Sequence, residues 1–222
     1  KMEYWSLEQA KLKNLKRKYF SGNVVLISGG CGEIGLSTAE SFHNEGAEVI
    51  LLEKEQNHIN NTPLNIKKFA KIIKCDVTNS ESLNRSIKEV VKIHGGIDIL
   101  VCNAGAPWQG EMAKISKNIM QKSLDLNLLS HHHISQHAVN VFLAQNTGGL
   151  LLYNISKQSI NPGKNFGPYG IAKAATLFMM RQYTLEYAKH GIRANGVNPD
   201  RVKTNFGGKN FVKERARSRG VK

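Results

Sequence analysis

Short apolar runs rich in β-branched residues recur along the chain, and most are followed by a longer stretch whose apolar positions have helical spacing. The short runs predict strands over residues 23–28, 48–52, 72–75, 97–101, 150–155 and 193–197. The longer stretches predict helices over residues 36–44, 78–94, 116–145 and 169–190, and the pattern leaves the third open to a break. Strands that alternate with helices and are apolar throughout predict a parallel sheet covered on both faces.

The order of these elements predicts one doubly wound α/β domain of the Rossmann type. It has three layers (α/β/α) and six strands in the order 3-2-1-4-5-6. We assign residues 21–222 to this single domain, because 222 residues with 41% hydrophobic content suit one sizeable core. Ser6 and Gln9 form a capping box that opens a basic helix over residues 7–19. Residues 1–20 are therefore expected to form a linker helix from an upstream domain.

A glycine-rich turn follows the first predicted strand and opens the first predicted helix. Glycines at such a turn let the backbone approach a pyrophosphate, and the helix N-terminus attracts its negative charge. The residues expected to contact a dinucleotide here are Gly29, Glu33, Ile34 and Gly35. The order strand, turn, helix, strand and carboxylate is a stronger signal than a lone glycine-rich turn.

Polar residues also mark the ends of the next strands. Glu53 follows the second strand, where a carboxylate would hydrogen-bond an adenosine ribose, and the alternative is a solvated charge at a strand end. The third and fourth strands are followed by further residues expected on the nucleotide side, namely Asp76, Val77, Asn103, Ala104 and Gly105.

Tyr169 and Lys173 lie four residues apart at the start of the last predicted helix. This spacing puts phenol and ammonium on one face, where the cation can stabilise a phenolate and make the tyrosine a usable base. Ser156 leaves the tip of the preceding strand and can converge with Tyr169 on one carbonyl group. A second Tyr-x-x-x-Lys, Tyr153 to Lys157, falls at a predicted buried strand, where four residues span about 13 Å, so we interpret it as chance.

The formal charge of +14 suggests nucleic-acid binding, but the lysines and arginines are spread along the sequence. No basic motif interleaved with aromatics and no finger spacing is present, so we do not expect nucleic acid as a partner. No apolar run approaches the ~20 residues of a membrane span, and the first 20 residues lack the apolar centre of a signal peptide. Three cysteines without Cys-x-x-Cys spacing argue against a disulfide framework. We expect a soluble, cytoplasmic protein with no membrane partner.

A histidine cluster, His131 to His133 with His137, raises the possibility of a metal site. Three adjacent histidines on a helix fan over about 200°, so only His133 and His137 share a face. No carboxylate or cysteine completes a ligand set. We therefore predict no metal site and a helix that packs against another subunit.

Together these motifs resemble the short-chain dehydrogenase/reductase family over nearly the whole chain after Ser21. The residues that carry the resemblance are the glycines of the first turn, Asp76, Asn103 to Gly105, Asn127, Ser156, Tyr169, Lys173, Pro199 and Thr204. The resemblance implies hydride transfer between a nicotinamide cofactor and an alcohol or carbonyl compound. It also implies a homo-oligomer formed through the helices that contain Asn127 and Phe178.

The family mechanism gives each residue of the site an implied role. Tyr169 exchanges the proton, and Ser156 hydrogen-bonds the substrate oxygen. Lys173 binds the nicotinamide ribose and lowers the pKa of the tyrosine, while Asn127 supports a proton relay through water. Thr204 contacts the carboxamide.

The cofactor is expected to be NAD rather than NADP. The Glu53 carboxylate would accept a hydrogen bond from a ribose 2′-hydroxyl but would repel a 2′-phosphate. Lys54 beside it offsets part of this negative charge.

A narrower resemblance connects the chain with the dehydrogenase part of bifunctional class II aldolase/short-chain dehydrogenase (rhamnulose-1-phosphate aldolase/alcohol dehydrogenase) proteins. It rests on residues 3–10, Ser156-Lys157, and residues 161–164 ahead of Phe166 to Tyr169. It implies a small alcohol or aldehyde substrate, such as lactaldehyde or a related sugar-derived compound, and fusion to an upstream aldolase domain. The alternative from another class is a non-catalytic nucleotide-binding or scaffold domain of a larger protein. The complete set of proton-transfer residues favours the enzyme.

Four features depart from the family pattern. Glu33 replaces the second fingerprint glycine, where its side chain would crowd a pyrophosphate and its charge would repel it. Cys102 replaces the first Asn of Asn-Asn-Ala-Gly, and Asp200 replaces a glycine in the loop on the nicotinamide side. Because only residues 205–222 follow the last motif, the family's last helix and strand are missing, and we expect the domain to be C-terminally incomplete.

Overall fold

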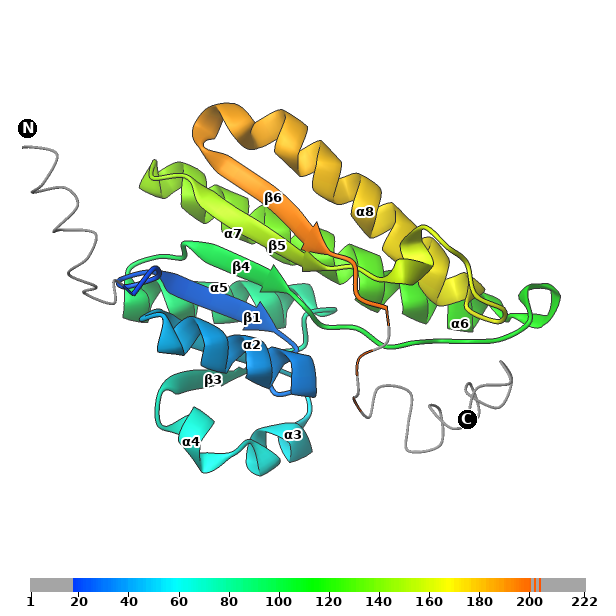
Figure 1. Ribbon diagram of the computed structural model, residues 1–222, viewed down its shortest axis with the longest axis horizontal. Coiled ribbons are helices and arrows are strands. Elements are labelled where there is room, and N and C mark those ends of the chain that lie inside the picture. The colour runs from blue at the N-terminus through cyan, green and yellow to red at the C-terminus, as the bar shows by residue number, and fades with distance from the viewer. Residues whose placement is uncertain (1–17, 201, 203, 205–222) are drawn as a thin grey trace, which may run out of the picture.

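The computed structural model describes residues 18–200 together with Val202 and Thr204. At its centre is a six-stranded parallel sheet in the order β3-β2-β1-β4-β5-β6 (Figure 1). The strands are β1 (Val24–Ser28), β2 (Glu48–Glu53), β3 (Ala70–Lys74), β4 (Ile99–Cys102), β5 (Gly149–Asn154) and β6 (Ile192–Val197). The predicted strand order is confirmed, since β1 lies inside the sheet and pairs with both β2 and β4.

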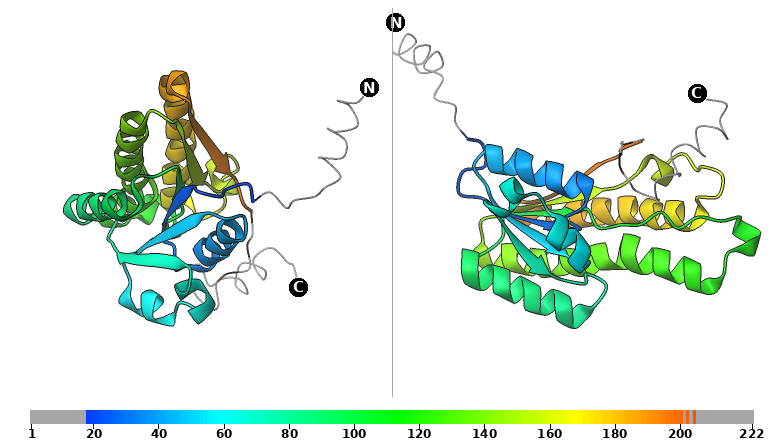
Figure 2. Two further views of the ribbon diagram at one scale, coloured as in Figure 1. Left: turned by 90° about the vertical axis from the view of Figure 1, so that its left-hand side faces the viewer. Right: turned by 90° about the horizontal axis from the view of Figure 1, so that it is seen from below.

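Helices lie on both faces of the sheet (Figure 2). They are α2 (Glu33–Asn44), α3 (Gln56–Asn61), α4 (Leu64–Lys67), α5 (Ser80–His94), α6 (Lys117–Leu124), α7 (Ser130–Gln145) and α8 (Gly167–Tyr187). The core on one face includes residues of α5, α7 and α8, and the core on the other face includes residues of α2 and α4. This arrangement is the predicted doubly wound α/β fold.

Alternation along the strands sends successive side chains into the two cores. On β1, Leu26 packs in the core under α5, α7 and α8, whereas Val25 and Ile27 pack in the core under α2. All three side chains are fully buried. Each such burial contributes about 1.5–3 kcal/mol relative to an exposed side chain, which explains why a short apolar run becomes an interior strand.

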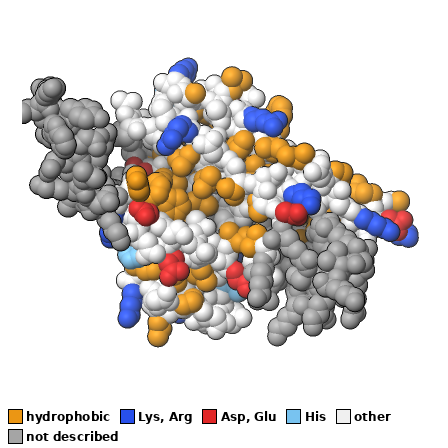
Figure 3. Space-filling view, in the orientation of Figure 1, with side chains coloured by type: hydrophobic (Ala, Val, Ile, Leu, Met, Phe, Trp, Pro, Cys, Tyr) orange, Lys and Arg blue, Asp and Glu red, His pale blue; other side chains and the backbone are white. Residues whose placement is uncertain are grey.

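The α2 side of the sheet is less completely covered at β5 and β6. Leu150 and Leu152 on β5 are only partly buried, and Arg193 and Asn195 on β6 are exposed. Figure 3 shows hydrophobic side chains exposed over β4 and β5 on this face. The helices of residues 18–200 on this side contact mainly β1, β2 and β3, so the third layer is open here within the described chain.

The predicted helix over residues 116–145 is interrupted. It consists of α6, a π-helical turn (Asp125–Leu129) and α7. Asn127 lies in the π-helical turn and is fully buried, with its amide bonded to the backbone of the loop after β4. The short helices α3 and α4 were not predicted, because neither has the apolar periodicity that marks a longer helix.

The predicted N-terminal helix, residues 7–19, lies outside the described residues except at its end. Lys18 is not helical and Tyr19 lies in a turn, so the helix predicted to end at about Tyr19 does not include these two residues, and the rest of it is not tested. The linker and the missing last strand remain predictions, because residues 1–17 and 205–222 are not described. In the described part, no helix is long and apolar enough to cross a bilayer.

Candidate active site

The predicted site residues gather at the carboxyl ends of the parallel strands. From β1 to β6 they are Gly29 with Glu33 to Gly35, Glu53, Asp76 with Val77, Asn103 to Gly105, Ser156, and Pro199. Tyr169 and Lys173 are added by α8, and Asn127 by the π-helical turn. In open parallel α/β sheets, this end is where ligands bind.

The segment that leads from β1 into α2 needs glycine at Gly29, Gly30 and Gly35, and a Cβ at Gly30 would lie 2.6 Å from the Cβ of Leu51. Gly29 has a φ of +60°, and a Cβ there would lie 2.9 Å from the Cα of Ala104. A Cβ on Gly35 would lie 2.6 Å from the carbonyl oxygen of Gly29. Gly32 caps the N-terminus of α2 and has room, since its Cβ would meet only the Gly29 oxygen at 3.4 Å. The turn and helix N-terminus therefore fit the pyrophosphate of a dinucleotide.

Glu33 is the first residue of α2 and is exposed, while Ile34 beside it is half-buried. A carboxylate in the first turn of a helix is favourable for the helix itself, because it faces the positive end of the helix dipole. The exposed position also gives the side chain room to turn toward solvent. The predicted repulsion of a bound pyrophosphate remains an expectation.

Asn103 connects the first turn to two neighbouring strands. Its Nδ2 donates to the carbonyl oxygens of Ser28 at 3.1 Å and Gly29 at 3.0 Å, and its Oδ1 accepts from Asn154 Nδ2 at 3.0 Å. The Ser28 hydroxyl accepts from the backbone amides of Asn103 at 3.0 Å and Ala104 at 3.2 Å. These bonds hold the ends of β1, β4 and β5 in register beneath the predicted nucleotide.

Glu53 is buried at the end of β2, where the sequence predicts a contact to the adenosine ribose. Its Oε1 accepts from the backbone amides of Lys54 at 3.0 Å and Glu55 at 3.1 Å, and His58 Nδ1 lies 3.5 Å from the same oxygen. The carboxylate is therefore held in one orientation. The sequence did not predict these contacts, since they depend on the backbone after the strand.

Asp76 forms an ion pair with Lys54, whose Nζ lies 3.0 Å from Asp76 Oδ2. Asp76 Oδ1 also accepts from the amide of Thr78 at 2.9 Å and from its hydroxyl at 2.6 Å. Burial opposes ionisation, but the Thr78 and Lys54 contacts outweigh it and lower the pKa of Asp76. The same hydrogen bond raises the pKa of Lys54, so the Lys54 charge is compensated by Asp76. Val77 next to Asp76 is part of the buried core.

The structure brings Ser156 and Tyr169 together. Both are buried, with Ser156 just beyond β5 and Tyr169 in the first turn of α8. The Ser156 hydroxyl accepts from the amide of Gln158 at 3.2 Å and is hydrogen-bonded to the phenol. Burial raises the pKa of Tyr169, and the Ser156 bond only partly offsets this effect. In the protein without cofactor the pKa of Tyr169 is therefore raised, whereas the family mechanism implies that it is lowered. The rise comes from removing the phenol from water.

Lys173 is almost fully buried, one helical turn after Tyr169. Its Nζ lies 5.8 Å from the centroid of the Tyr169 ring and donates to the carbonyl oxygen of Asn154 at 2.8 Å. Burial lowers the pKa of Lys173 to about 8. The side chain is therefore still mostly cationic at pH 7, as a group that stabilises a phenolate must be.

Asn127 uses its side chain on the loop after β4. Its Oδ1 accepts from the amide of Ala106 at 3.2 Å, and its Nδ2 donates to the carbonyl oxygens of Ala106 at 3.0 Å and Ser123 at 3.2 Å. A Cβ on Gly105 would lie 2.9 Å from Asn127 Oδ1, so this contact needs a glycine. The backbone carbonyl of Asn127 accepts from the Thr176 hydroxyl at 2.7 Å. The side-chain amide of Asn127 is therefore occupied by these bonds, and a water of the expected proton relay would bind to the backbone carbonyl.

The loop after β6 lies against the segment that follows Ser156. Pro199 accepts a hydrogen bond from the amide of Lys157 at 3.0 Å, and Lys157 Nζ lies 2.7 Å from Asp200 Oδ2. Asp200, which departs from the family pattern, therefore has a partner that the sequence did not predict. Thr204 is described and half-buried.

His131 supports the site in a way that the sequence did not predict. It is fully buried, and its Nε2 lies 2.8 Å from the carbonyl oxygen of Ala104, which requires the proton on Nε2. Burial, and the Lys173 charge to a smaller degree, lower the pKa of His131 to about 3, so the ring is neutral. Among the described residues, no group of three metal-ligating side chains comes together.

Tyr153 lies in β5 and is fully buried, as the sequence predicts. Its hydroxyl lies 2.7 Å from the Ser135 hydroxyl, and burial raises its pKa. Lys157 lies beyond the strand and pairs with Asp200 instead. The second Tyr-x-x-x-Lys is therefore no part of a proton-transfer pair.

Comparison with known proteins agrees with this geometry. The short chain dehydrogenase family model matches residues 23–215. Dehydrogenase/reductase SDR family member 4 of Bos taurus is 26% identical over 205 residues, which cover 90% of this chain and 73% of that protein. The uncharacterized oxidoreductase YuxG of Bacillus subtilis is 32% identical over 232 residues, which cover 99% of this chain but 33% of that longer protein.

A solved structure shows the same fold. NAD⁺-bound xylitol dehydrogenase superposes with a TM-score of 0.78 at 26% identity, covering 82% of this chain and 71% of that one. The family match extends from the first residues of β1 to well beyond β6. The chain therefore belongs to the short-chain dehydrogenase/reductase family and is an NAD(P)-type oxidoreductase.

Proposed function

We propose that the chain transfers a hydride between NAD and a small alcohol or aldehyde. The observation that carries the proposal is the buried contact between Ser156 and Tyr169, with the Lys173 ammonium 5.8 Å from the phenol ring. A non-catalytic scaffold would not need a buried cation beside a buried phenol, since both carry a desolvation cost. Calorimetric titration with NAD and NADH, followed by a rate screen of small alcohols and aldehydes, tests the proposal. Absence of any cofactor binding would contradict it.

The site residues divide the proton chemistry between them. Because the Ser156 oxygen accepts from the Gln158 amide, its own proton can be donated to the substrate oxygen or to Tyr169. Tyr169 takes the hydroxyl proton of an alcohol substrate, and Lys173 supplies the positive charge that favours the phenolate. A nicotinamide cofactor held at the strand ends and by Lys173 would supply the acceptor for the hydride of the alcohol carbon. Asn127 and His131 hold the loop after β4 in place through Ala106 and Ala104.

We infer a preference for NAD over NADP from the orientation of Glu53. Two backbone amides hold its carboxylate, and Asp76 compensates the charge of the neighbouring Lys54. A 2′-phosphate within a few ångströms of this carboxylate would cost about 1–4 kcal/mol, so NAD is expected to bind at least about fivefold more tightly than NADP. Glu53→Gln should reduce the difference between the dissociation constants for NAD and NADP. Glu55→Gln changes an exposed carboxylate nearby and should leave that difference unchanged. Equal dissociation constants for NAD and NADP in the wild type would refute the assignment.

The substrate is proposed to be a small, sugar-derived alcohol or aldehyde such as lactaldehyde. The loop after β4 meets the loop before α8 where the Gly110 amide donates to the Asn165 carbonyl at 2.8 Å. The loop before α8 is part of the segment that leads from Ser156 to Tyr169, so the two loops together would limit the size of a substrate. Similarity to a protein named xylitol dehydrogenase supports a polyol-like compound. A rate screen that includes lactaldehyde, xylitol and a bulky alcohol tests this choice.

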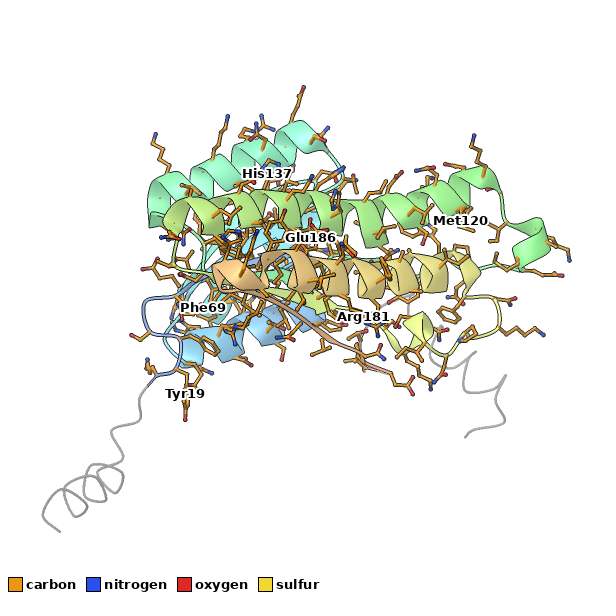
Figure 4. All side chains as sticks on the ribbon, turned by 90° about the horizontal axis from the view of Figure 1, so that it is seen from above. Tyr19, Phe69, Met120, His137, Arg181 and Glu186 are labelled. Atoms are coloured by element: carbon orange, nitrogen blue, oxygen red, sulfur yellow. The ribbon has the colours of Figure 1, made fainter. Side chains whose placement is uncertain are left out.

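We propose that the chain forms a homo-oligomer through α7 and α8, which Figure 4 shows side by side with His137 on α7 and Glu186 on α8. Ile171, Phe178 and Leu185 recur every seven residues on α8 and are 45%, 68% and 78% exposed. Seven-residue spacing puts them on one stripe of the helix, which suits packing against a second helix.

Phe178→Glu is expected to shift the chain to a smaller species, because a carboxylate would be buried in the contact. The matched control is Leu64→Glu on α4, where a similarly exposed apolar side chain lies on the other face of the domain. Light scattering at micromolar concentration measures both variants. An unchanged mass for Phe178→Glu would rule out this face.

We further propose an upstream aldolase domain and a cytoplasmic location. The match to one third of YuxG is compatible with a longer polypeptide. Cys31, Cys75 and Cys102 are free and buried, which suits a reducing compartment. Assaying the full-length polypeptide for aldol cleavage of rhamnulose 1-phosphate tests the fusion.

A further inference from the structure

The pairing of β5 with β6 continues beyond the two strands and encloses Ser156. The amide of Ile155 donates to the carbonyl of Val197 at 2.9 Å, and the amide of Lys157 donates to the carbonyl of Pro199 at 3.0 Å. Bonds from every second residue are the pattern of a parallel ladder. Ser156 therefore lies between two backbone bonds that connect it to the chain leaving β6.

Side chains close the end of this extended ladder. Lys157 Nζ lies 2.7 Å from Asp200 Oδ2, and the Ser159 hydroxyl donates to Asn198 Oδ1 at 3.5 Å. The side chains of Lys157 and Asp200 are 34% and 59% exposed, so the ion pair is open to solvent. Two features that the catalytic chemistry does not use, the lysine of the second Tyr-x-x-x-Lys and the aspartate in place of a family glycine, thus meet at one point beside Ser156.

We propose that the Lys157–Asp200 ion pair is a positioning device that holds the loop after β6 against the turn carrying Ser156. The inference rests on the proposed function and on the family resemblance, which implies that Pro199 and Thr204 bind the nicotinamide end of the cofactor. Lys157 and Asp200 act through that loop and do not touch the reacting atoms. An exposed pair contributes little to the overall stability of a domain, but it can restrict where a short loop lies.

The sheet topology predicts that loss of the ion pair weakens binding at only one end of the cofactor. β5 and β6 lie at one side of the sheet, whereas Glu53 and Asp76, proposed to bind adenosine, follow β2 and β3 at the other side. A loosened loop after β6 should therefore weaken contacts to nicotinamide and leave contacts to the ADP-ribose part unchanged. Because the pair is exposed, salt should screen it.

The test compares binding of NAD and of ADP-ribose to wild type, Lys157→Met, Asp200→Asn and the double variant by calorimetry. Each single variant is expected to raise the dissociation constant for NAD about two- to fivefold, with no further loss in the double variant. The dissociation constant for ADP-ribose should not change. Exchanging the charges, Lys157→Asp with Asp200→Lys, should restore NAD binding. Raising the salt concentration should weaken NAD binding to wild type more than to the double variant.

Glu89→Gln is the matched control, since Glu89 pairs with Lys71 at 4.0 Å on the surface near β3. It removes an exposed ion pair far from the loop and should leave both ligands unaffected. Equal weakening of NAD and ADP-ribose by Asp200→Asn would show general loosening and overturn the positioning role, as would unchanged NAD binding. Failure of the wild type to bind either ligand would instead refute the proposed function, and this inference with it.

Discussion

Tyr169→Phe is expected to lower turnover by roughly 10²- to 10⁴-fold while cofactor binding stays nearly unchanged. Loss of a hydride from an alcohol carbon requires the hydroxyl proton to leave, and a phenol of pKa near 10 is a poor acceptor at pH 7. Burial raises the pKa of Tyr169 further in the protein alone, and Ser156 offsets only part of this rise. The Lys173 charge and the positive charge of an oxidised nicotinamide must therefore supply the lowering during reaction.

The pH dependence follows from the same contacts. A base whose pKa is raised in the free protein needs a higher pH to lose its proton, so oxidation of an alcohol should speed up as pH rises. The Tyr169→Phe variant keeps the ring, whose centroid lies 6.3 Å from that of Phe166, but lacks the hydroxyl that carries the proton. Initial rates across pH, together with calorimetric NAD binding, measure both effects.

Tyr153→Phe is the internal control for this prediction. The Tyr153 hydroxyl is buried against Ser135, so its loss should cost about 1 kcal/mol of stability and leave turnover intact. Wild-type turnover in Tyr169→Phe, on any substrate that the chain oxidises, would show that the catalytic assignment is wrong.

Much of the fold could be predicted because local and long-range signals agree. Runs such as residues 24–28 are apolar on both faces, and each is followed by a helical stretch, so a right-handed parallel sheet is the natural arrangement. The two short helices α3 and α4 could not be predicted in this way. They are held by contacts of Ile59 and Ile66 with the core under α2, which no periodicity of six or four residues can reveal.

The proximity of Ser156, Tyr169 and Lys173 could also be predicted, because their relation is local. Tyr169 and Lys173 lie on one helical turn, and Ser156 follows the strand that feeds that helix. By contrast, the contacts of His131 with Ala104 and of Lys157 with Asp200 join residues far apart in the sequence. Their partners are fixed only when β4, β5 and β6 lie side by side, so sequence spacing carries no sign of them.

Replacing Lys173 with Met is expected to stabilise the protein without cofactor and to impair its function. Burial lowers the pKa of Lys173 from 10.5 to about 8, which means that the folded state binds this proton less tightly than the unfolded state. Unfolding free energy should therefore rise with pH between about 8 and 10.5, and the cost of the buried ammonium is fully present below about pH 8. At pH 7 this cost is about 3 kcal/mol. Loss of the hydrogen bond from Lys173 to the Asn154 carbonyl lowers stability by about 1 kcal/mol. The net effect of Lys173→Met should therefore be a free energy of unfolding about 2 kcal/mol higher than in wild type.

The gain should be largest near pH 7 and should disappear near pH 10, where the folded-state amine is neutral and the small remaining cost is offset by the lost bond to Asn154. Buried Cys102, whose pKa burial raises to about 12, destabilises both proteins above about pH 9, so the difference between variant and wild type is the quantity to measure.

Lys92→Met on the exposed face of α5 is the control and should show no such pH-dependent difference. Urea unfolding from pH 7 to 10 gives the stability, and calorimetry with rate measurements should show weaker NAD binding and at least about 10²-fold slower turnover. A variant less stable than wild type at pH 7 would mean that the buried ammonium is stabilised by its surroundings. A cation kept beside Tyr169 at a cost to the fold is what a site selected for proton transfer requires.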